Sequence, residues 1–163
     1  MIEMVVVTSL IAIISVFLVN LVVTSQNALL IENTAAPVRA QAKQAMETME
    51  KELREADPSS PTPGGVTIGG SGTSQSITFY IPDDVSKTQI DSWKQITYAH
   101  DADEKQIART ESGTSTIIGR DISGLQFSTS NNVVTITVTA SKTISGGTGT
   151  IQFPLISQVR LRN

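Results

Sequence analysis

The chain has 163 residues, no cysteine and a net charge of -3, with a pI of about 5.1. Without cysteine it has no disulfide and no thiolate for metal binding or nucleophilic catalysis. Basic residues nowhere form a cluster longer than a pair, so we expect no nucleic-acid binding through phosphate neutralisation. The length allows one anchor segment and one domain of ordinary size.

An apolar stretch begins the chain. Met4 to Val23 carry no charged side chain, and the next ionisable residue is Glu32. About 20 apolar residues are what a helix needs to cross the ~30 Å hydrocarbon layer of a bilayer. We therefore predict a membrane-competent helix over residues 1–24.

Glu3 lies beside this stretch, where an unpaired carboxylate is unfavourable in a lipid-like medium. In one interpretation Glu3 marks the interface end of a simple anchor. In the other it is buried and paired with a cation of another copy. Arg39 is the nearest basic side chain, so only an amino terminus at Met1, the chain's own or a neighbour's, is close enough.

A second helical segment is predicted over residues 25–57. Pro37 is its first helix-disturbing residue, and we expect a bend or a new first turn there. Beyond Pro37, apolar residues recur at spacings of three and four, which predicts one buried helix face. They are Val38, Ala42, Ala45, Met49, Leu53 and Ala56. The helix should end near Asp57, because Pro58 disfavours helical dihedrals in the residue before it.

The remaining chain is predicted as a Pro/Gly/Ser-rich connector over residues 58–75 and an antiparallel β-rich domain over residues 76–163. Candidate strands are Val66–Ile68, Ser76–Ile81, Lys94–His100, Gln106–Thr110, Ser115–Ile118, Gly124–Phe127, Val133–Thr139, Thr150–Phe153 and Gln158–Arg162. We expect Lys94–His100 and Gln106–Thr110 to form a hairpin across the acidic turn at residues 101–104. The fold class is therefore α+β, with the second half of the helix packed on the sheet.

No residue pattern predicts catalysis or a cofactor. His100 is the only histidine, and we interpret it as a surface residue at a strand end, although a Ser-His-Asp arrangement can assemble in space from any spacing. Asp101, Asp103 and Glu104 are weak candidates for calcium ligands, because their oxygens are close in sequence but miss the usual loop pattern. The alternative is a solvated turn.

The N-terminal segment resembles that of type IV pilins and type II secretion pseudopilins. Ile2-Glu3-Met4-Val5-Val6, followed by Ile11-Ala12-Ile13-Ile14, carries this resemblance. The helix that ends in residues 46–56 is similar to that of minor pilins and minor pseudopilins, especially of the J type. A looser similarity extends to Ile96–Tyr98, Gln106–Arg109, Asp121–Phe127 and Val159–Asn163. Glu3 lies two positions earlier than the glutamate of this family, and Asn20 occupies the mid-anchor region where a proline is common.

The resemblance implies a structural subunit and not an enzyme. Such a subunit is held in the inner membrane by its helix and is then assembled, with an inner-membrane platform, into an extracellular or periplasmic filament. The family glutamate neutralises a neighbour's amino terminus, a role that we carry to Glu3. The partners implied are copies of itself and other pilin-like subunits. Two alternatives stay open: a minor pseudopilin or tip subunit, and a membrane-anchored binding module with Trp93 as a contact.

Overall fold

The computed structural model describes residues 2–56, 65–83, 92–144 and 149–161. It divides into two compact units, residues 1–36 and 37–163. One helix, α1, runs from Ile2 to Glu55 and contributes to both units. The predicted anchor, residues 1–24, lies within the first unit.

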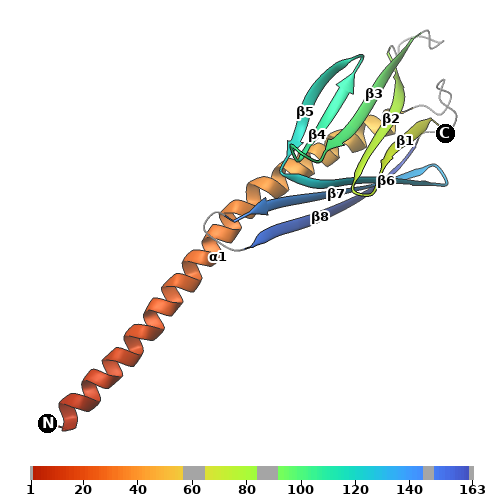
Figure 1. Cartoon of the computed structure of the whole chain (residues 1–163). Coiled ribbons are helices and arrows are strands. Elements are labelled where there is room, and N and C mark those ends of the chain that lie inside the picture. The colour runs from red at the N-terminus through yellow and green to blue at the C-terminus, as the bar shows by residue number, and fades with distance from the viewer. Residues whose placement is uncertain (1, 57–64, 84–91, 145–148, 162–163) are drawn as a thin grey trace. The chain divides into compact units, whose positions relative to one another are not determined.

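The elements follow the predicted order of one helix and then strands (Figure 1). The strands are β1 (Val66–Ser71), β2 (Ser74–Pro82), β3 (Trp93–Asp101), β4 (Gln106–Glu111), β5 (Thr114–Arg120), β6 (Ile122–Ser130), β7 (Val133–Thr143) and β8 (Thr150–Arg160). The α+β class is confirmed.

The strands form one sheet in the order β5-β4-β3-β2-β6-β7-β8, with β1 paired to β2. Every pairing is antiparallel except that of β2 with β6, which are parallel at Ser74 and Leu125. The predicted hairpin is confirmed as β3 and β4, which face each other across the turn at residues 102–105. Two tight turns use left-handed backbone: Ser112-Gly113 joins β4 to β5, and Asn131-Asn132 joins β6 to β7.

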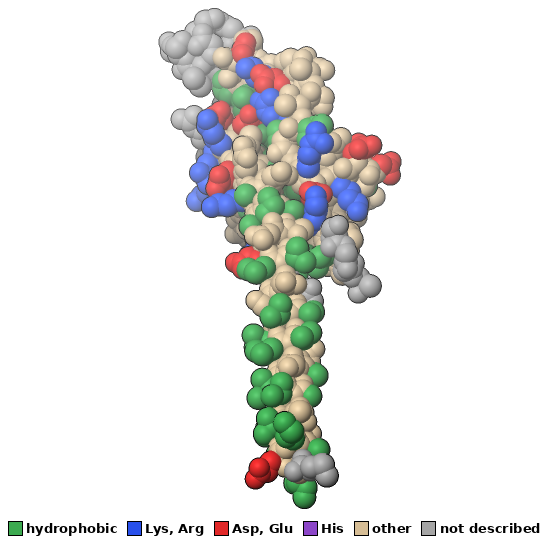
Figure 2. Space-filling view, turned by 90° about the vertical axis from the view of Figure 1, so that its left-hand side faces the viewer, with side chains coloured by type: hydrophobic (Ala, Val, Ile, Leu, Met, Phe, Trp, Pro, Cys, Tyr) green, Lys and Arg blue, Asp and Glu red, His purple; other side chains and the backbone are tan. Residues whose placement is uncertain are grey.

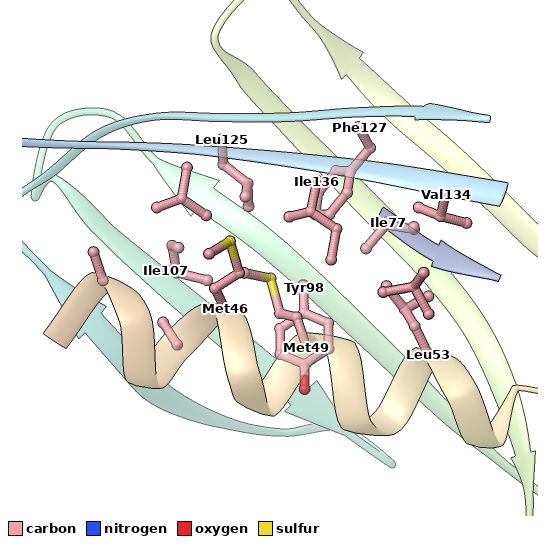
Figure 3. Close-up of a cluster of buried hydrophobic side chains, with 14 of the residues drawn as sticks. Met46, Met49, Leu53, Ile77, Tyr98, Ile107, Leu125, Phe127, Val134 and Ile136 are labelled. Carbon is pink, nitrogen blue, oxygen red and sulfur yellow. The ribbon is translucent and has the colours of Figure 1, made fainter. Parts of the chain in front are cut away.

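The core of the second unit lies between α1 and one face of the sheet. All six residues of the predicted helix stripe are buried, and together with Met46 they pack against strand residues such as Phe79, Tyr98 and Ile136. Figure 3 shows Met46, Met49 and Leu53 on the side of the helix that faces the sheet. On β5, Gly119 allows this close approach, since a Cβ there would lie 3.2 Å from the Cβ of Ala45.

Two predictions of element boundaries differ from the structure. The connector predicted over residues 58–75 was too long, because β1 and the beginning of β2 fall within it. The predicted strands Thr150–Phe153 and Gln158–Arg162 are parts of the single strand β8, which ends at Arg160. Pro154 lies between them, and β8 is an edge strand in which proline is tolerated. The helix ends at Glu55, close to the predicted end.

Pro37 lies inside α1, so no separate helix begins there. The bend expected at Pro37 stays a prediction, because it falls at the division between the two units.

Candidate functional site

The apolar part of α1 is the principal candidate site. Every described side chain from Ile2 to Glu32 is exposed, and the large hydrophobic ones range from 82% exposed at Ile2 to 43% at Ile31. Figure 2 shows hydrophobic side chains on the outside of this part of the helix. Soluble monomers rarely expose a continuous apolar surface of this extent, which marks a site of contact with lipid or protein.

The hydroxyl groups between Met4 and Thr24 are compatible with an apolar surrounding. Thr8 and Ser9 donate to backbone carbonyls of the preceding turn, over distances of 2.7–3.1 Å. Ser15 and Thr24 donate in the same way to the carbonyls of Ile11 and Asn20, each over 2.8 Å. These polar groups are therefore satisfied within the helix and need no water.

Glu3 lies in the first turn of α1 and is exposed. A carboxylate there interacts favourably with the positive end of the helix dipole. Within the described part of the chain, Glu3 forms no salt bridge. Met1, the other residue predicted for the assembly site, lies outside the described residues. The predicted pairing of Glu3 with an amino terminus therefore stays a prediction.

A polar cluster joins α1 to β3 and β4 in the second unit. The Glu52 carboxylate accepts the Tyr98 hydroxyl at 2.5 Å and two nitrogens of Arg109 at 2.8–3.1 Å. Arg109 also pairs with Glu111 at 2.6 Å, and Glu111 pairs with Lys94 at 2.9 Å. The side chains of Glu52 and Arg109 are only 16% and 18% exposed. Sequence spacing did not indicate Glu52, whose partners are 46 and 57 residues away.

The cluster shifts the pKa values of its members in directions that favour its present charges. Burial raises the pKa of Tyr98 far above its ordinary value, and the hydrogen bond to Glu52 raises it further. The hydrogen bond to Glu52 raises the pKa of Arg109. Hydrogen bonds from Lys94 and Arg109 lower the pKa of Glu111. The Tyr98 hydroxyl therefore stays protonated beside the Glu52 carboxylate and the Arg109 guanidinium. The hydrogen bonds of Glu52 to Tyr98 and Arg109 join the helix to the sheet.

His100 connects three strands. Its Nε2 donates to the carbonyl of Ile122 over 2.9 Å, because a carbonyl can only accept, and its Nδ1 lies 2.8 Å from the Ser74 hydroxyl. No carboxylate among the described residues hydrogen-bonds to the ring. His100 is thus half-buried between β2, β3 and β6, and it is not the exposed strand-end residue that the sequence predicted.

The acidic turn after β3 uses one of its carboxylates for its own backbone. Asp101 Oδ1 accepts the N–H groups of Asp103 and Glu104 over 3.0 and 3.1 Å. All three side chains are exposed. Among the described residues, no group of three or more acidic or histidine side chains is arranged to hold a metal ion. The geometry is that of a solvated turn.

The chain is an α+β protein, and within the residues that the structure describes one helix, α1, is long and apolar enough to cross a membrane. No protein-family model matches its sequence, and neither does any curated protein.

Proposed function

We propose that this protein is a structural subunit of a type IV pilus-like filament. In this proposal α1 holds the subunit in the inner membrane before assembly and lies inside an extracellular or periplasmic filament afterwards. The observation that carries the proposal is that every described apolar side chain between Ile2 and Ile31 is exposed. The proposal rests further on the resemblance of the N-terminal segment to those of pilins and pseudopilins.

The exposed apolar side chains of α1 favour burial, first in lipid and then against other helices. Burial of apolar area contributes about 25 cal/mol per Å² relative to water, so the bare helix is strongly disfavoured in solution. Lipid would cover it before assembly, and helices of other copies would cover it in the filament. Thr8, Ala12 and Ser15 are small residues spaced at about one turn, which allows helix backbones to approach closely.

Glu3 supplies specificity in this proposal. It has no salt bridge within the described chain, and moving it into a helix bundle would leave its charge unpaired. The amino terminus of a neighbouring subunit would neutralise it. Only one axial offset between neighbouring helices places Glu3 beside an amino terminus, and that offset is favoured because the charge is then paired. The apolar contact between the helices thereby acquires a defined axial position.

Charge reversal tests the pairing. Glu3→Lys should abolish filaments in cells that assemble the unmodified protein, because two positive charges would then face each other. Glu32→Lys is the matched control, since Glu32 is also exposed on α1 but lies beyond the apolar stretch. Electron micrographs and the sedimentable fraction of the protein report assembly. Normal filaments from the Glu3→Lys variant would eliminate the pairing mechanism.

A second candidate function is a membrane-anchored binding module, or a minor tip subunit that binds a partner through its sheet. A shallow hollow on the sheet surface favours it, lined by Gln75, Gln126, Phe127, Ser128, Thr135 and Thr137. Trp93 was the predicted contact, but it is half-buried as the first residue of β3. Removal of residues 1–36 separates the candidates: a filament subunit loses assembly, whereas a binding module keeps its affinity.

A further inference from the structure

Asn20 differs from every other polar side chain between Met4 and Thr24. The four hydroxyl residues of this stretch all hydrogen-bond to carbonyls of their own helix. The side chain of Asn20 has no hydrogen-bond partner among the described residues, and it is exposed. A side-chain amide carries two N–H donors and a carbonyl acceptor, so one bond to a helix carbonyl would not satisfy it.

The position of Asn20 in the helix makes an amide without hydrogen-bond partners unfavourable once the helix lies in a membrane. It lies about 25 Å along the helix from Glu3, within the ~30 Å thickness of a hydrocarbon layer. An amide without partners is unfavourable in such a medium. A hydrogen bond to another helix relieves the cost, and asparagine side chains associate membrane helices in this way.

We propose that Asn20 joins two copies of the chain as a parallel helix pair in the membrane, before any filament forms. The inference rests on the membrane location in the proposed function, but not on the Glu3 contact. Copies of one chain share their orientation and depth, so Asn20 of one copy meets Asn20 of the other. The side-chain amide is self-complementary, because each can donate an N–H to the other's carbonyl.

The surface around Asn20 fits a second helix. A shallow hollow is lined by Phe17, Asn20, Leu21, Thr24, Ser25 and Ala28. Asn20, Thr24 and Ala28 are four residues apart, so they lie above one another on one helix face. None is large, whereas Phe17 and Leu21 beside them offer apolar contact area. No charge lies in this surface to repel an identical copy.

Cysteine crosslinking tests the pair, since the chain has no cysteine of its own. Ile13→Cys places a thiol seven residues from Asn20, about 20° from it around the helix, and Ile11→Cys places one on the opposite side. These two positions are matched, because both isoleucines are 58% exposed. The full-length variants are reconstituted in phosphatidylcholine vesicles without assembly proteins and then oxidised. The folded second unit stays outside the vesicle, which gives all copies one orientation.

We expect several-fold more disulfide dimer from Ile13→Cys than from Ile11→Cys. Adding Asn20→Leu should lower the Ile13→Cys dimer about threefold to fifteenfold, and Asn20→Gln should restore part of it. Asn33→Leu is the control, since Asn33 is an exposed asparagine of α1 beyond Glu32.

Equal crosslinking at the two positions, or no effect of Asn20→Leu, would overturn the inference. Either result leaves the filament proposal intact, because Glu3 pairing is untouched. Failure of the unmodified chain to remain with the vesicles on flotation would instead contradict the membrane location and with it both proposals.

Discussion

Glu52 illustrates how much a single side chain can contribute to joining a helix to a sheet. It accepts hydrogen bonds from Tyr98 and Arg109, which come from two different strands. The helix pattern predicted the buried apolar stripe but gave no sign of Glu52, because an acidic residue beside that stripe ordinarily faces water. Only the folded chain brings its partners together.

Removal of the Glu52 carboxylate should destabilise the second unit. Glu52→Ala leaves the Tyr98 hydroxyl and the Arg109 guanidinium without their partner at a largely buried position. We expect the free energy of unfolding to fall by about 2–3 kcal/mol, as measured by urea denaturation. Glu55→Ala, an exposed position one turn away, should change it by less than about 0.5 kcal/mol. Similar losses in the two variants would show that the cluster contributes little.

Tyr98 gives the fold a predicted sensitivity to alkaline pH. Its pKa is raised in the folded chain, whereas an unfolded tyrosine ionises near pH 10. The folded state therefore binds the proton more tightly, so this contribution to stability is complete below about pH 10 and declines as the pH rises above it. Tyr98→Phe removes the titrating group. Its free energy of unfolding should decline less steeply between about pH 10 and pH 11.5. Parallel slopes for the two proteins would contradict the assignment.

At the scale of the elements, the spacing of apolar residues predicted which face of the helix is buried, because that depends on the local sequence alone. The stripe from Val38 to Ala56 identified a buried helix face correctly, since burial follows the 3.6-residue period of the helix. The sequence did not predict the continuity of β8 through Pro154, because tolerance of proline depends on the strand lying at a sheet edge. The parallel contact of β2 with β6 likewise depends on tertiary packing.

The candidate site was predictable to a similar degree. The apolar composition of residues 4–23 predicted a membrane-competent helix, and in the structure the side chains of these residues are exposed. The hydrogen bonds that satisfy the helix hydroxyls follow from helix geometry, and they single out Asn20. What covers the helix depends on other molecules, so the role of Glu3 stays a proposal.

Gly119 sets how closely α1 packs on the sheet. Gly119→Val should lower the free energy of unfolding by about 1–3 kcal/mol, because the added atoms meet Ala45, Ile122 and Ile107. Thr116→Val places the same side chain at an exposed position of β5 and should have little effect. Thermal unfolding of both variants measures the difference. A Gly119→Val variant as stable as the parent would show that the helix can shift without loss of packing.

At the scale of the whole molecule, the two units have different kinds of surface. The buried hydrophobic cluster of the second unit consists of residues between Val38 and Leu161, which gives this unit a core of its own. The described side chains of the first unit up to Asn33 are all exposed, so this part of the helix has no comparable core. The first unit must therefore obtain its stabilising contacts from its surroundings, which is the physical basis for proposing assembly.

Immunogold electron microscopy of the cells that make this protein tests the central claim most directly. Antibodies against residues 37–163 should label filaments along their length, and cells that produce the Glu3→Lys variant should show label on the envelope without filaments. Label confined to the filament ends would identify the minor-subunit alternative. Label spread over the envelope of unmodified cells, with no filament carrying it, would contradict the assignment of this chain as a filament subunit.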